Sequence, residues 1–160
     1  MNGGSVLQTG QEVLYRVKNG SGTNISNGDV VAFDAGPGNS GILGGQLAIA
    51  DGTLPSRYTM GIATQNIEDG DDGYVTHFGK VRGIDTTGFS VGETWSVGQE
   101  LWLSDTNPGK LTNDKPSAPN NKVSVAAVVT ADSNGTLFVR PHYLGNLDEA
   151  DDVQYQRTKQ

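Results

Sequence analysis

The 160-residue chain contains no cysteine. A disulfide framework and a thiolate metal site are therefore excluded. The chain also lacks any run approaching the ~18 apolar residues that a membrane-spanning helix needs, so no membrane partner is expected. Residues 1–10 have neither the charged nor the apolar region of a secretory signal, and no signal peptide is expected.

Positive charge is scarce as well. Lysine and arginine number 11 against 18 aspartates and glutamates, which gives a formal net charge of −7. An acidic surface repels phosphate backbones, and the sequence has no basic stripe with interleaved aromatic residues. We therefore expect no nucleic-acid partner.

The remaining pattern is typical of short strands and tight turns. Most of the 23 glycines stand beside Asn, Asp or Ser, and no window of 11 residues keeps a helical period. Val13, Tyr15 and Val17 alternate with their neighbours as in a strand. The pattern predicts an all-β fold, a compact sandwich or barrel, with further strands at 29–33, 46–50, 58–64, 74–79, 80–85, 101–103, 123–130 and 136–140.

The chain divides into three parts. Residues 1–10 are small and polar and are expected to form an N-terminal arm, and residues 11–141 the β domain. Residues 142–160 are expected to form an acidic C-terminal tail, with four carboxylates between 148 and 152 and few large apolar residues.

A weak internal repeat is visible within the domain. The stretch 28–33 (GDVVAF) resembles 98–103 (GQELWL), and each is followed later by a similar strand ending, 61–64 and 127–130. Two related halves of a barrel would produce this repeat, and so would chance in a chain rich in Gly and Val.

Motifs that could carry catalysis lack their structural context. Residues 36–41 match GxGxxG, but no helix pattern follows, so a surface loop is predicted. Ser40 stands in a turn similar to that of serine-protease nucleophiles, yet His77 and His142 both lie downstream of it. A pairing of His77 with Asp85 has no sequence support. We expect no enzyme; a glycan hydrolase using Glu93, Glu100 or Asp105 ranks well behind.

Metal and sugar sites are also disfavoured. The stretch 68–73 (EDGDDG) has the ingredients of a calcium loop but lacks the EF-hand pattern, so a solvated acidic turn is favoured and calcium stays open. Two isolated histidines do not make a transition-metal site. Aromatic residues could line a sugar platform, but core or subunit contacts are the favoured interpretation. No cofactor is expected.

Several segments together resemble a known group of proteins. They are YRVKNGSGTNISNG (15–28), MGIATQNI (60–67), GKVRGIDTTG (79–88) and GQELWLSDTNPGKLT (98–112), followed by PSAP and a V-x-V-x-x-V-V strand. The sequence resembles, over residues 11–141, capsid decoration (cement) proteins of tailed bacteriophages, of the β-tulip type, and related fibre modules.

The resemblance implies a non-enzymatic virion protein on the outer capsid surface. It implies a homotrimer that binds the major capsid protein and stabilises contacts between neighbouring subunits, with terminal arms reaching onto a neighbour or the shell. The alternative is a tail- or head-fibre module that binds host glycans or proteins. The predicted interface residues are Val6, Leu7, Tyr15, Trp95, Trp102, Tyr143, Leu144 and Tyr155.

Overall fold

The computed structural model describes residues 12–35, 40–52 and 58–146, and its strands belong to one continuous sheet. One helical element in this part of the chain is a short 3-10 turn, η2 (Phe89–Val91). No helix among the described residues is long and apolar enough to cross a bilayer. The strands are β1 (Val13–Asn19), β2 (Val30–Asp34), β3 (Gly44–Leu47), β4 (Thr59–Ala63), β5 (Asp72–Ile84), β6 (Glu100–Leu103), β7 (Leu111–Thr112), β8 (Lys122–Thr130) and β9 (Gly135–Gly145).

The first five strands close into a barrel in the order β1-β3-β2-β4-β5, because β1 also pairs with β5. The β1–β3 contact is parallel, whereas the other ladders of the barrel are antiparallel. Alternating residues of the strands point inward and are fully buried, among them Val17, Val31 and Val75. Together with Ile25 and Ile67 they form the core of the barrel.

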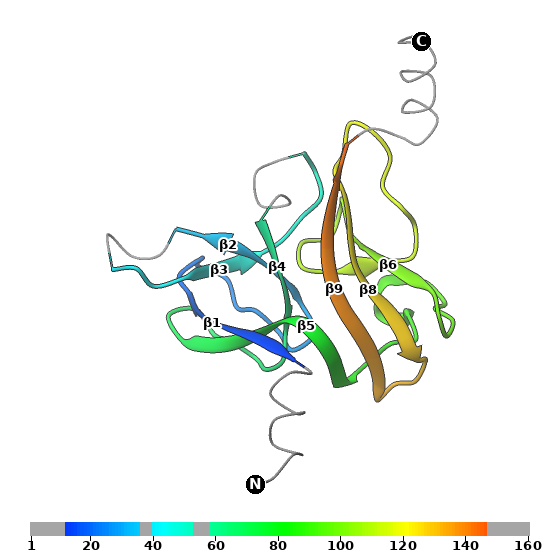
Figure 1. The fold of residues 1–160 in the computed structure, drawn as a ribbon, viewed down its shortest axis with the longest axis horizontal. Coiled ribbons are helices and arrows are strands. Elements are labelled where there is room, and N and C mark those ends of the chain that lie inside the picture. Colours follow the sequence, from blue (N-terminus) through cyan, green and yellow to red (C-terminus); the bar gives the residue numbers. More distant parts are fainter. Residues whose placement is uncertain (1–11, 36–39, 53–57, 147–160) are drawn as a thin grey trace, which may run out of the picture.

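Strand β5 belongs both to the barrel and to the remaining part of the continuous sheet, which we call the second sheet. Its first half pairs with β1 and β4, and its second half, from Gly79 to Ile84, pairs with β9. The sheet then continues through β8, β6 and β7. Figure 1 shows β5 crossing from the barrel strands toward β9, with β8 and β6 beyond it.

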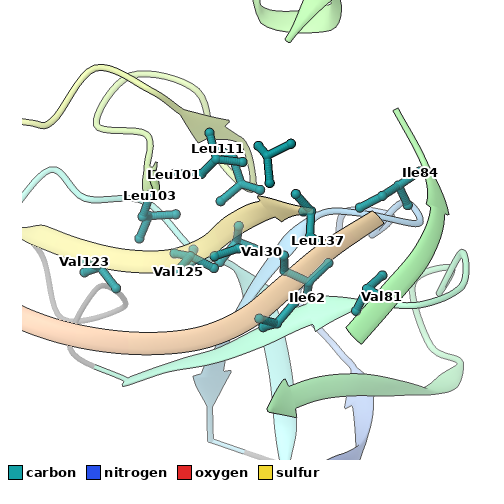
Figure 2. Packing of buried hydrophobic residues seen from close by; sticks show 14 of the residues in the cluster. Val30, Ile62, Val81, Ile84, Leu101, Leu103, Leu111, Val123, Val125 and Leu137 are labelled. Carbon is teal, nitrogen blue, oxygen red and sulfur yellow. The ribbon is translucent and has the colours of Figure 1, made fainter. Parts of the chain in front are cut away.

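A second, larger core lies between the barrel and this sheet. Val30 and Ile62 face outward from the barrel, and Leu101, Val125 and Leu137 face them from the second sheet (Figure 2). All five side chains are fully buried. Burying side chains of this size stabilises a fold by about 1.5–3 kcal/mol each, so this packing holds the two halves together.

The predicted repeat has a counterpart in the hydrogen bonding. The N–H of Gly28 donates to the carbonyl of Ala63 at 2.8 Å, and the N–H of Gly98 donates to the carbonyl of Val128 at 2.8 Å. In each half the residue after the glycine accepts a hydrogen bond from that same strand residue. The matching geometry favours two related halves over a chance similarity of sequence.

The turn before β7 is hydrogen-bonded to the barrel. Its Gly109 accepts a hydrogen bond from the N–H of Val30 at 2.8 Å and donates to the carbonyl of Ala48 at 2.7 Å. Lys110 then forms an ion pair of 2.9 Å with Asp29, whose side chain is 7% exposed. The two halves are therefore joined by polar contacts as well as by the larger core.

The all-β prediction is confirmed, with shifted boundaries. The two predicted strands at 74–79 and 80–85 are one continuous strand, β5, because β9 takes over its pairing where β1 and β4 end. Strand β9 runs on to Gly145, so residues 142–145 of the expected tail continue this strand. Residues 1–11 and 147–160, and 36–39 of the GxGxxG motif, lie outside the described residues. The division into arm, domain and tail stays a prediction.

Candidate interaction surface

A mixed apolar and basic surface covers the outer side of β5 and β9. We call it the outer face, and its members come from β1, β5 and β9: Val13, Phe78, Lys80, Arg82, Phe138 and Arg140. The register sets this arrangement, because Lys80 pairs with Phe138, and the adjacent pair, Val81 with Leu137, points into the core. The outer face therefore follows from the same alternation that fills the larger core.

Its apolar centre is the contact between Phe78 and Phe138. Their rings meet edge to face, with centroids 5.4 Å apart, although Phe78 is 43% and Phe138 37% exposed. Val13, opposite Phe78 on β1, is 45% exposed. An aromatic pair that stays accessible beside another apolar residue is the kind of surface that binds proteins.

Its charge is unusual for this acidic chain. Lys80 and Arg82 are exposed, and within the described residues neither forms an ion pair. Arg140 lies 3.9 Å from Glu100 and also donates to Ser124. Glu12, whose carboxylate accepts a hydrogen bond from Thr76, also lies near this face. The surface thus carries a small excess of positive charge.

Three of the predicted interface residues are accessible, one on β1 and two consecutive residues on β9. Tyr15 on β1 is 36% exposed, and its ring packs against His77 with centroids 5.3 Å apart. Tyr143 and Leu144 lie near the end of β9 and are also accessible; the Tyr143 hydroxyl donates to Asn121. Their contact with a partner stays a prediction.

The two tryptophans are largely buried within the chain. Trp95 belongs to the larger core, and Trp102 has Lys115 over its ring at 5.2 Å. Each is 7% exposed, which leaves little surface for a partner. The other predicted interface residues, Val6, Leu7 and Tyr155, lie outside the described part of the chain.

Glu93 is held by three donors. Its carboxylate accepts hydrogen bonds from the Trp95 indole, the Thr112 hydroxyl and the Asn113 N–H. Burial raises the pKa of Glu93, but the hydrogen bonds from Thr112, Trp95 and Asn113 outweigh it and hold the pKa below its ordinary value. This carboxylate is a structural anchor between η2 and β7.

The other polar residues singled out in the sequence also have structural partners. Glu100 accepts from Ser124 and Asp105 from Asn120, while His77 Nδ1 lies 2.7 Å from the Met60 carbonyl. Asp85 accepts from the N–H and hydroxyl of Thr87, which lower its pKa, the hydroxyl bond contributing most. The imagined His77–Asp85 pairing is not among the contacts that these residues make.

The acidic turn at 68–73 is tied to the barrel. Asp69 accepts a hydrogen bond from the N–H of Gly22, and Asp72 forms an ion pair of 2.9 Å with Arg16 and lies 3.6 Å from Lys18. Within the described ranges, no three His, Asp or Glu side chains are grouped so as to hold a metal ion. The carboxylates of Asp69 and Asp72 thus serve turn geometry and surface ion pairs.

The sequence reasoning missed the aromatic pair of the outer face. Phe138 stands between the buried Leu137 and Val139, so strand alternation alone places it outward. The same alternation from Val81 places Phe78 on the outer side of β5. Their contact could not be found from either strand alone, because it depends on the register between β5 and β9.

Comparison with known proteins defines the class. The model of the phage cement protein family matches residues 7–141, so the chain belongs to this family. It is therefore a structural protein of the phage virion, associated with the capsid, and its family is not a family of enzymes.

The solved structures that resemble this fold include the head fibre gp8.5 N base of bacteriophage phi29. The two share 18% sequence identity with a TM-score of 0.46, over 87% of this chain and 100% of that chain. No curated protein sequence matches this chain.

Proposed function

We propose that this protein binds the outer surface of the phage capsid as a homotrimer and stabilises the contacts between major capsid subunits. The observation that carries the proposal is the family match, which spans residues 7–141 and so covers β1 to most of β9. The fold agrees with a structural role, because Glu93, Glu100, Asp105 and His77, which the sequence singled out, make hydrogen-bond contacts within the domain.

The mechanism would be mass action. A protein that binds the assembled shell but not its separated subunits shifts the equilibrium toward the shell, by about 2.7 kcal/mol per site when its free concentration is 100 times Kd. A trimer multiplies the effect, because binding at one subunit raises the effective concentration of the others near the shell. No bond needs to be made or broken, and a rigid domain with adhesive surfaces suffices.

The contacts would come from the two chain ends and from accessible apolar side chains. Residues 1–10 and the part of 142–160 that follows β9 are the proposed arms, and each can add an extended segment to a neighbouring surface. Tyr15, Tyr143 and Leu144 are accessible enough to take part, whereas Trp95 and Trp102 support the domain from within.

Electron microscopy of particles with and without the gene for this chain tests the proposal. The proposal predicts difference density of three β domains around three-fold and quasi-three-fold axes of the head. Difference density at the tail or along a fibre would instead favour a fibre module. Light scattering on the purified chain separately tests the trimer, which a monomer at micromolar concentration would contradict.

A further inference from the structure

The outer face combines exposed cations with an accessible aromatic pair, although the chain as a whole is acidic. Lys80 and Arg82 stand exposed beside the edge-to-face pair of Phe78 and Phe138, in a chain with a net charge of −7. Neither cation forms an ion pair within the described residues. A ligand that suits this surface carries several negative charges followed or preceded by large apolar groups.

The sequence after β9 has this composition. Residues 147–155 read LDEADDVQY, with acidic residues at 148, 149, 151 and 152, and then Val153 and Tyr155. One short segment of the same polypeptide therefore has carboxylates that can pair with the cations of the outer face. It also has apolar side chains that can pack on the two phenylalanines.

The segment can also reach the face. Phe138 lies about 23 Å from Gly145 at the ~3.3 Å rise of a strand residue. Residues 147–160 extend up to about 46 Å, which leaves ample length for a chain reversal. Gly145 has φ +88°, a left-handed conformation that favours such a reversal, and Asn146 forms a bend after it.

The order of residues fits a return path along β9. A segment that reverses after Gly145 passes Arg140 first and Phe138 second, and its carboxylates precede its apolar residues in the same order. We expect the segment to bind the outer face of its own chain rather than that of a second copy. The short linker after β9 holds the segment at an effective millimolar concentration near its own face.

We propose that, in the free protein, residues 147–155 fold back along β9 and cover the outer face of their own chain. The acidic residues meet Arg140 and Lys80, and Val153 and Tyr155 cover Phe78 and Phe138. Glu12, bonded to Thr76, and Glu100, 3.9 Å from Arg140, lie at the borders of the face. The inference stands on the charges and the register and does not depend on the proposed function.

The absence of native cysteine permits a direct test in the full-length chain. Lys80→Cys combined with Gln154→Cys is oxidised mildly and followed by non-reducing electrophoresis. The proposal predicts rapid formation of a disulfide within one chain, seen as a faster monomer band. The matched control, Lys18→Cys with Gln154→Cys, replaces a lysine that pairs with Asp72 at the start of β5, outside the half of β5 that pairs with β9, and should oxidise far more slowly.

Two outcomes overturn the proposal. Equal oxidation rates for both pairs would show that the segment collides with the surface at random, and disulfides between chains would assign the face to a second copy. An independent readout is alkylation of Lys80→Cys alone. Replacing the four acidic residues by their amides should speed it at least about threefold, because the cover is then weakened, and an unchanged rate contradicts the proposal.

Discussion

The indole N–H of Trp95 donates a hydrogen bond of 2.7 Å to Glu93, so the segment after η2 is tied to itself and, through the same carboxylate, to β7. Thr112 and Asn113 are the donors on the β7 side. Trp95 is thus fixed by a carboxylate and held in the larger core.

Removing this anchor should destabilise the domain. Glu93→Ala leaves the Trp95 indole, the Thr112 hydroxyl and the Asn113 N–H without their acceptor, and we expect a loss of about 1–3 kcal/mol in the free energy of unfolding. Urea unfolding followed by tryptophan fluorescence measures it. Glu68→Ala, an exposed carboxylate in the acidic turn, is the control and should change stability by less than about 0.5 kcal/mol.

The same carboxylate should contribute to acid sensitivity. The pKa of Glu93 is lowered in the folded protein from its ordinary value of 4.5. Its contribution to stability is therefore present above that value and is lost as the pH falls through the folded pKa. We expect the wild type to lose more stability than Glu93→Gln between about pH 6 and pH 3. Parallel losses in both proteins would show that Glu93 contributes nothing to the acid limb.

Gly61 should tolerate no side chain. It has φ +149°, and a Cβ built on it would lie 1.9 Å from the carbonyl oxygen of Thr76 in the neighbouring strand. Gly61→Ala must push β4 away from β5, and we expect a loss of at least about 3 kcal/mol or failure to fold. Gly70→Ala is the matched control, because Gly70 also has positive φ (+93°) but no atom within 4 Å. It should cost only about 1–2 kcal/mol, and equal urea midpoints would refute the steric account.

The ion pair between Asp29 and Lys110 should matter more than the one between Arg16 and Asp72. Both pairs have a distance of 2.9 Å, but Asp29 is 7% exposed whereas Asp72 is 40% exposed. We expect Lys110→Met to cost about 1–3 kcal/mol, because it leaves a buried carboxylate with less compensation. Arg16→Met should cost less than about 1 kcal/mol. Thermal unfolding of both variants measures the difference. Equal losses of stability would contradict this explanation.

The fold class could be predicted because apolar and polar residues alternate along the strands. Leu137 and Val139 point inward on either side of Phe138, as a half-buried strand requires, and the turns at Gly28 and Gly98 begin the strands expected after them. The closure of the barrel could not be predicted, because the parallel contact of β1 with β3 involves Lys18 and Asn19 beside two glycines, which have no pattern to fix register.

The residues of the outer face were not among the interface residues predicted from the sequence. Trp95 and Trp102 were predicted as interface residues because they are large and aromatic, yet both are largely buried. The local sequence does not show which side chains other elements of the fold cover. Phe78 and Phe138 are brought together by pairing between distant strands. Such long-range register is the information that a single sequence carries least clearly.

The most direct measurement of the central claim is the temperature at which phage heads release their DNA. Heads that lack this protein should release DNA several degrees below complete heads, and adding the purified chain to the deficient heads should restore the higher temperature. Both effects follow if the protein binds the assembled shell and thereby stabilises it. The same release temperature with and without the protein, in heads shown to bind it, would contradict a cementing role.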